Sequence, residues 1–312
     1  MKKILTVVII SLSLIGFAFF IALFLSNSLK YEEKVLTKND DDTSIGDTTC
    51  IEEYTVQLVT NKSVQSNELG TYYRLSNNTL EGMGANSFHT LGKDEYYDDW
   101  VKIAENVIMY DFNTTNLIYL TKDGSVYGSG NIEGGVLQIE TNDNNRFIDL
   151  STPKLLIEDV VNISLGCRFV IVLKRDKTVW FWGETENGQS GTISDQIVDP
   201  VKIIDNAIQI KAVMYTSFWI DEKMNLWAMG DNSYGQIGNG DEGDGFPTKH
   251  NNCVTDPYLV LENCNSIYSS NEDTIIHAIT TGGIRYLWGG NMYSTPTQET
   301  ENTLSYTHQE MS

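Results

Sequence analysis

The chain has 312 residues, 41% of them hydrophobic and 20% charged, a balance typical of a globular protein and not of a disordered one. Its formal net charge is −21. Such an acidic surface repels phosphate backbones, whose binding depends on Lys and Arg. The composition therefore argues against nucleic acid as a partner.

The N-terminus carries an apolar run from Ile4 to Leu25 with no charged residue in it. Its length matches the about 20 residues that cross a bilayer as a helix, so we expect residues 1–29 to be a retained membrane anchor that contacts the membrane through residues 4–25. A cleaved signal is an alternative, for which Ser26-Asn27-Ser28 is the one segment that resembles a cleavage site. A buried core helix is the other.

Lys2 and Lys3 precede the apolar run, and no equally clear positive cluster follows it. The positive-inside rule then leaves the N-terminus in the cytoplasm and the bulk of the chain outside. We therefore expect a membrane-anchored protein whose folded part lies at the cell surface, or a secreted one if residues 1–28 are removed.

Three further regions follow. Residues 30–50 lack an apolar period and contain the acidic run Asp40-Asp-Asp42, so we expect a solvated stalk there. Residues 296–312 are polar and are predicted to form a tail. The folded region is expected between them, over residues 51–295.

A glycine motif repeats along this folded region. Its clearest copies begin at Val179 and Leu226, and their glycines fall at the same offsets. Weaker copies surround Gly84, Gly130 and Gly289, and successive copies lie about 45 to 60 residues apart, a spacing typical of propellers and solenoids. The residues that define the repeat are Gly84, Gly130, Trp182, Gly183, Gly188, Gln189, Gly191, Gly230, Gly235, Gln236, Gly238 and Gly289.

Short segments rich in Val, Ile, Tyr and Trp lie between the copies, as in Ile118 to Gly124 and Phe218 to Asp221. Such segments, bounded by Gly, Asn and Asp, are typical of antiparallel strands joined by tight turns. Four short strands cannot bury both faces of their sheet alone, whereas radial stacking of the units does. We therefore predict an all-β fold, a β-propeller of four-stranded antiparallel blades, preceded by one N-terminal transmembrane helix.

The motifs resemble the repeats of the regulator of chromosome condensation family, which includes the alpha-tubulin-suppressor-like repeats. The family pattern is a strand ending in Trp-Gly, then Asn-x-x-Gly-Gln-Leu-Gly, later Pro-x-x-Ile, and a strand closing on Asp-Gly. The two clearest copies fit this pattern with two departures, because Met229 replaces the Trp in one and Thr185 replaces the Asn in the other. The resemblance covers about residues 51–295.

The resemblance implies a propeller that usually has seven blades, but this chain supplies fewer units. Residues 51–79 resemble the second half of a unit, four whole units follow, and residues 284–291 resemble the first half of another. We therefore predict five blades, in a ring closed by N- and C-terminal strands that share one sheet. Degenerate further repeats and an open ring are the alternatives.

No catalytic motif is recognisable. The four histidines (His89, His250, His277 and His308) stand outside any nucleophile motif, and no two acids are placed as acid and base. Asp231 and residues 239–244 form an oxygen-rich loop of the kind that calcium prefers, but the spacing differs from that of a twelve-residue calcium loop, so we favour a solvated loop. We predict no catalytic residue, no cofactor and no metal.

The four cysteines are too few and too scattered for a disulfide scaffold. Cys253 and Cys264 could bridge a loop outside the cytoplasm, and four unpaired thiols are the alternative.

The loop from Ser87 to Trp100 places aromatic side chains among acids. Tyr and Trp are favoured at the energetic centres of protein interfaces, so this loop is the best candidate for binding. The alternative is that Trp100 packs on the sheet at the start of a strand. The candidate partner-binding residues are Phe88, Tyr96, Tyr97, Trp100 and, in a later repeat, Tyr234.

A propeller fold does not decide function, and three functions are considered. The first is a non-catalytic protein-binding module displayed outside the cytoplasm, similar to secreted members of the family such as a propeller-type β-lactamase inhibitor that binds through aromatic loops. The second is a carbohydrate- or cell-wall-binding propeller, which the Trp-rich strands permit. The third is guanine-nucleotide exchange, which the export segment and the acidity disfavour. We expect the first.

Overall fold

The computed structural model describes residues 64–139, 149–241, 243, 252–269 and 274–299. The expected membrane segment (1–29), the expected stalk (30–50) and the first residues of the predicted propeller lie outside the described residues. Among the residues that are described, no helix is long and apolar enough to cross a membrane.

The described residues form five four-stranded antiparallel sheets, each made of strands consecutive in the chain. The first contains β1 (Gln65–Ser66), β2 (Thr71–Ser76), β3 (Thr79–Ala85) and β4 (Tyr96–Ala104), and the second contains β5 (Val107–Phe112), β6 (Asn116–Thr121), β7 (Val126–Asn131) and β8 (Asp149–Ile157). The third contains β9 (Val160–Leu165), β10 (Phe169–Lys174), β11 (Val179–Thr185) and β12 (Ser194–Ile204). The fourth contains β13 (Ala207–Val213), β14 (Thr216–Asp221), β15 (Leu226–Asp231) and β16 (Cys253–Leu261), and the fifth contains β17 (Cys264–Tyr268), β18 (Ile275–Thr280), β19 (Arg285–Gly289) and β20 (Tyr293–Gln298).

The second strand of each sheet shows why the sheets stack. In β10 five consecutive residues are buried, which requires apolar contacts on both faces of the sheet. Val170 and Val172 pack toward the second sheet, whereas Ile171 and Leu173 pack toward the fourth. The second strands β6 and β14 have the same five buried residues as β10, so each of the three inner sheets packs between two neighbours, as expected for blades that share their cores.

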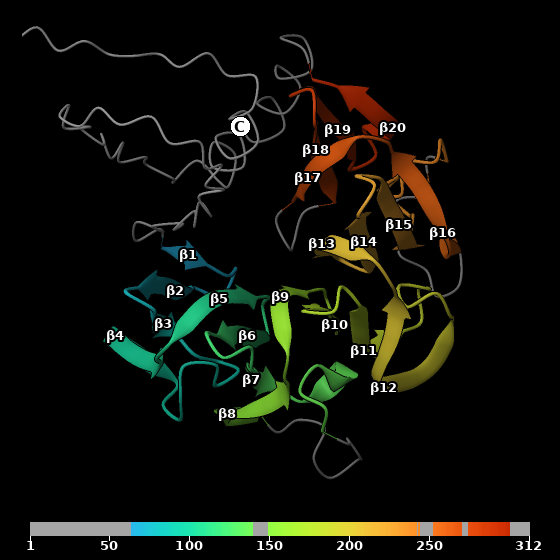
Figure 1. Ribbon diagram of the computed structural model, residues 1–312. Coiled ribbons are helices and arrows are strands. Elements are labelled where there is room, and N and C mark those ends of the chain that lie inside the picture. The colour runs from blue at the N-terminus through green and yellow to red at the C-terminus, as the bar shows by residue number, and fades with distance from the viewer. Residues whose placement is uncertain (1–63, 140–148, 242, 244–251, 270–273, 300–312) are drawn as a thin grey trace, which may run out of the picture. The chain divides into compact units, whose positions relative to one another are not determined.

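Four core clusters join the five sheets in sequence order, each built from two consecutive sheets. Figure 1 shows the sheets following one another around a common centre, with β5, β9 and β13 near that centre and β4, β8, β12 and β16 on the rim. Among the described residues, no core cluster joins the fifth sheet to the first. The prediction of an all-β fold with five four-stranded units is therefore confirmed.

The prediction that N- and C-terminal strands share one sheet is wrong. The segment around Tyr72, read as the closing half of an earlier unit, is β2, and it pairs with β3 through Tyr72–Met83 and Leu75–Leu80. Each sheet is thus complete on its own. The error arose because the glycine motif marks the third strand of a sheet, so that the sequence repeat starts in the middle of a blade. The last strand, β20, also runs to Gln298, three residues past the expected boundary at 295.

A row of side-chain hydrogen bonds joins each of the second to fifth sheets to the loop that follows the third strand of the sheet before it. The accepting carbonyl lies six residues after the motif glycine in every case. The four bonds are Ser129 Oγ to Thr90 O (3.2 Å), Trp182 Nε1 to Val136 O (2.8 Å), Ser217 Oγ to Gln189 O (2.7 Å) and Trp288 Nε1 to Gln236 O (2.8 Å).

This row explains the Met found where the family repeat has Trp. Met229 occupies the position of Trp182 and Trp288 but has no donor. Its cross-strand neighbour Ser217 supplies the hydrogen bond instead, to the carbonyl of Gln189. The interface between the third and fourth sheets therefore keeps its polar connection with a different residue.

Candidate protein-binding surface

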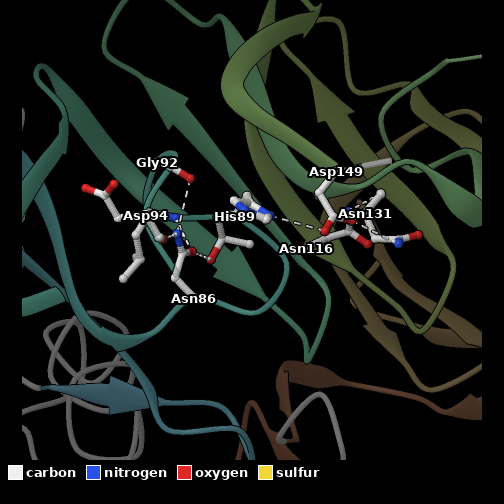
Figure 2. Close-up of polar contacts among 9 residues, drawn as sticks. Asn86, His89, Gly92, Asp94, Asn116, Asn131 and Asp149 are labelled. Atoms are coloured by element: carbon white, nitrogen blue, oxygen red, sulfur yellow. Dashed lines mark hydrogen bonds and ion pairs between the residues drawn. The ribbon is translucent and has the colours of Figure 1, made fainter. Parts of the chain in front are cut away.

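The loop that follows β3, residues 86–95, is organised by one buried side chain, Asn86, which is 1% exposed. Its Oδ1 accepts the backbone N–H of Leu91 at 2.8 Å and the Thr90 hydroxyl at 3.5 Å. Its Nδ2 donates to the carbonyls of Gly92 at 3.1 Å and Asp94 at 2.6 Å, as Figure 2 shows. An amide that meets four groups of its own loop fixes the path of that loop, because a buried amide is costly to leave unpaired.

The underside of the loop is anchored in the core of the first sheet. Leu91 is 6% exposed and belongs to the cluster shared with the second sheet. The Thr90 hydroxyl lies 2.7 Å from the Tyr73 hydroxyl. Burial raises the pKa of Tyr73, and the hydrogen bond with Thr90 lowers it by a smaller amount. At the start of the loop, Gly84 has φ +94°, and a Cβ there would lie 2.2 Å from the carbonyl oxygen of Gly70. The loop is therefore held at its start and, through Thr90 and Leu91, at its centre.

His89 connects this loop to the second sheet. Its Nδ1 lies 3.3 Å from Asp149 Oδ2 at the start of β8, and Asn131 Nδ2 donates to Asp149 Oδ1 at 3.1 Å. The carbonyl of Asn131 in turn accepts a hydrogen bond from Asn116 Nδ2 at 2.7 Å. Figure 2 shows His89 reaching from the loop toward Asp149. This chain of contacts ties the loop to the neighbouring blade as well as to its own.

The loop leads into β4, the outer strand of the first sheet, which presents aromatic side chains among acids. Tyr96 is 61% exposed. Tyr97 is half-buried, and its hydroxyl accepts the N–H of Asp94 at 3.2 Å. The Arg74 guanidinium lies 4.0 Å from the centre of the Trp100 ring, and Arg74 Nε also donates to Glu81 Oε2 at 2.7 Å. Trp100 is thus held by a cation–π contact on the sheet, with the edge of β4 beside it.

The edge of β4 differs from the other outer strands in one position. In the third sheet, Val201 pairs with Phe181 and is preceded by Pro200. The corresponding residue is Pro153 in β8, Pro257 in β16 and Pro296 in β20, but Trp100 in β4. Proline lacks a backbone N–H and protects an exposed edge from pairing with another strand. The first sheet is the one described sheet whose outer strand lacks this protection.

Four of the five candidate binding residues lie together in this region. Phe88 is half-buried in the loop 86–95, and Tyr96, Tyr97 and Trp100 follow on β4. Tyr234 lies elsewhere, in the loop after β15 of the fourth sheet, where its carbonyl accepts a hydrogen bond from Asn291 N at 3.1 Å. Trp100 also packs on the sheet, as the alternative interpretation predicted, because its ring contacts the Arg74 guanidinium.

Asn86, His89 and Asp149 were not among the site residues predicted from the sequence. Asn86 could have been found by aligning the repeats, because it occupies the position of Asn232, whose Oδ1 accepts the N–H of Ile237 at 2.9 Å just as Asn86 accepts that of Leu91. The His89–Asp149 contact joins residues 60 apart in different sheets. No pattern in the sequence predicts it.

The remaining alternatives from the sequence concern metal and disulfide chemistry. Within the described part of the chain, no group of three His, Cys, Asp or Glu side chains could hold a metal ion. Asp231 accepts hydrogen bonds from Ser233 and from Gln236 Nε2 at 2.8 Å, so its carboxylate is engaged by its own turn. Cys253 and Cys264 do not form a disulfide with each other. Burial raises the pKa of the Cys264 thiol to about 12.

No protein-family model matches the chain. Solved structures that resemble it include Prp20 from Saccharomyces cerevisiae, at 20% identity and TM-score 0.61 over 75% of this chain and 62% of that one. The yeast RCC1 protein Prp20 bound to Kap60 matches at 18% identity and TM-score 0.61 over 75% and 60%. Human WBSCR16 matches at 16% identity and TM-score 0.60 over 74% and 65%. The chain spans about three fifths of the length of these proteins, and it has an RCC1-like β-propeller fold.

Proposed function

We propose that this chain is a non-catalytic protein-binding propeller, displayed outside the cytoplasm, that engages its partner through the loop 86–95 and the outer edge of β4. The observation that carries the proposal is the replacement of the edge proline by Trp100. An unprotected edge can accept a strand from a partner, whose main chain then supplies affinity while neighbouring side-chain contacts supply specificity.

Three features of the surface support this use. The loop is preorganised by Asn86 and His89, which lowers the ordering cost of binding. Tyr96 is exposed beside the edge, and Tyr is favoured at interface centres. Asp98 and Asp99, both exposed on β4, favour a partner segment that carries Lys or Arg, since complementary charge steers association.

The related folds are consistent with protein binding. Prp20 has been solved bound to Kap60, and its binding properties to Gsp1p and to histones have been described. Because the identities are near 20%, we do not assign the partners of Prp20 to this chain. The low identity and the acidity of this chain leave nucleotide exchange without a supporting observation, so protein binding is the function we carry forward.

The binding proposal is tested with Trp100→Pro in the full-length chain. Four other outer strands hold proline at this position, so we expect the variant to fold and to lose its partner. Affinity capture from the extracellular fraction, with captured proteins identified by mass spectrometry, compares the wild type with Trp100→Pro and Tyr96→Ala. Tyr258→Ala on β16 is the matched control, because Tyr258 is 37% exposed on an edge that carries Pro257. Equal capture by Trp100→Pro and the wild type would contradict the proposal.

The display outside the cytoplasm is tested separately. Protease added to intact cells should digest the propeller and leave a protected N-terminal fragment if residues 1–29 remain as an anchor. If the protease digests the propeller only after the cells are lysed, the display outside the cytoplasm is refuted. The binding surface would then be judged by the capture experiment alone.

A further inference from the structure

A pocket of about 480 Å³ opens between the third and fourth sheets, at the end of the strands opposite the loops that follow the motif glycines. Its volume lies within the range of small-ligand sites. The two indole rings of Trp219 and Trp227 form one wall, Pro257 of β16 lies beside them, and the turns that contain Asn206 and Lys223 form the rim.

The indole wall is rigid. The rings of Trp219 and Trp227 are nearly parallel, with an interplanar angle of 10° and centroids 6.5 Å apart. Trp219 is 5% exposed and supports Trp227, which is half-buried and lines the pocket. Trp227 Nε1 donates to Asp221 Oδ2 at 3.0 Å, which fixes the ring in its plane. A flat aromatic platform therefore lines the pocket.

The Asp221 carboxylate is engaged by the protein itself. Besides Trp227, it accepts the backbone N–H groups of Lys223 and Asn225, both at 2.9 Å, and the Asn225 amide at 3.1 Å. Burial acts to raise the pKa of Asp221, but the hydrogen bonds from Asn225, Trp227 and Lys223 outweigh it and hold the pKa below its usual value. The carboxylate is thus ionised and positions the platform.

The charges around the pocket balance. Asp205 forms an ion pair with Lys202 at 3.0 Å, and Glu222 forms one with Lys177. The charge of Asp221 is matched by that of Lys223 on the neighbouring turn. A cage for a quaternary ammonium ion would combine aromatic faces with excess negative charge, so this balance favours a neutral ligand.

The equivalent indole in the third sheet lies under a lysine side chain. Trp180 occupies the position of Trp227 in the strand register, but the Lys174 ammonium lies 4.5 Å from the centre of its ring. Trp180 Nε1 donates to the hydroxyl of Thr178 at 3.0 Å. Lys174 corresponds to Asp221, since each ends the second strand of its sheet. In the fourth sheet Asp221 replaces this lysine, and it contacts the Nε1 edge of the Trp227 ring and not the face of the ring.

We propose that this pocket binds a neutral pyranose unit of a glycan. The apolar C–H face of the sugar ring would lie on the indole of Trp227, because the negative face of an aromatic ring attracts polarised C–H groups. The amide of Asn206 and the ammonium of Lys223 on the rim would donate to the hydroxyls. The site lies apart from β4 and does not depend on the proposed protein-binding function.

Saturation-transfer NMR on the full-length chain tests the proposal, with the methyl glycosides of glucose, galactose, mannose and N-acetylglucosamine as probes and tetramethylammonium as the cationic competitor. We expect at least one glycoside to be saturated at protons on one face of its ring and not to be displaced by tetramethylammonium. Trp227→Ala should weaken it at least about tenfold, and Trp180→Ala should leave it within about twofold.

Asp221→Lys provides a second variant, which keeps both indoles and places an ammonium where Lys174 lies over Trp180. It should abolish saturation while its circular dichroism remains that of the wild type. Absence of saturation for all four glycosides, equal loss in Trp180→Ala, undiminished binding in both Trp227→Ala and Asp221→Lys, or displacement by tetramethylammonium would each overturn the proposal.

Discussion

Ser217→Ala is the most direct test of how the sheets are held together. Ser217 is 1% exposed, and its hydroxyl donates to the carbonyl of Gln189 in the loop of the third sheet at 2.7 Å. The substitution removes a single oxygen atom and leaves no cavity that could hold a side chain. Any loss of stability therefore reports the hydrogen bond between the two sheets.

The expected loss follows from the cost of a buried acceptor without its donor, about 1–3 kcal/mol. For a domain of this size, about 2–4 °C of Tm corresponds to each kcal/mol, so Ser217→Ala should melt about 2–12 °C below the wild type. Trp288→Phe should lose more, because it removes both a donor to Gln236 and part of a fully buried ring.

Urea unfolding followed by tryptophan fluorescence gives the free energy of unfolding, with thermal melting by circular dichroism as a second measurement. Ser66→Ala is the matched control, because Ser66 is exposed on β1, and it should remain within about 0.5 kcal/mol of the wild type. If Ser217→Ala were as stable as Ser66→Ala, with an unchanged urea slope, the row of donors would not hold the sheets and this reasoning would be wrong.

Two further predictions concern backbone geometry and thiol chemistry. Gly230→Ala should destabilise the chain far more than Gly283→Ala, because both have positive φ but a Cβ at Gly230 would lie 2.4 Å from the Tyr215 carbonyl, whereas one at Gly283 meets nothing within 4 Å; equal melting temperatures would contradict this. The Cys264 thiol, whose pKa is raised to about 12 by burial, should resist iodoacetamide at pH 8 in the native chain and react in urea, since the thiolate is the reactive form; peptide mapping would reveal early modification if the burial were wrong.

The fold was predictable because the repeat consists of glycines that the backbone conformation requires. Gly183 and Gly230 have φ of +111° and +125°, and a Cβ on either would meet the carbonyl before the second strand of the same sheet. Such positions tolerate little but glycine, so the motif persists where side chains vary. The strand segments between them, with apolar residues on both faces, then imply stacked sheets.

The contacts that build the candidate surface were not predictable in the same way. His89 was seen as one of four isolated histidines, because Asp149 lies in another sheet and no local spacing connects them. The sequence also does not predict that Ser217 supplies the hydrogen bond that Met229 cannot, because the two residues are neighbours only through the cross-strand register. Trp100 was read as a candidate for binding or packing, and its meaning as a missing edge proline required the register of all five outer strands.

The first sheet carries charged side chains on the face where an inner sheet carries aromatic ones. In the fourth sheet, the paired positions of the second and third strands hold Trp219 and Trp227, which stack against each other. The same positions in the first sheet hold Arg74 and Glu81, joined by an ion pair at 2.7 Å, and no earlier sheet among the described residues faces them. Terminal units of repeat arrays need a polar outer face to remain soluble.

The fifth sheet ends in a comparable way. His277 stands where the fourth sheet has the buried Phe218, and its Nδ1 lies 2.9 Å from Glu299 Oε1 while its ring stacks on Tyr268. The loop after Gly289 is also short, because β20 begins at Tyr293. Ionisable side chains with carboxylate partners therefore lie at both outer faces, at the positions where the fourth sheet carries Trp219 and Phe218.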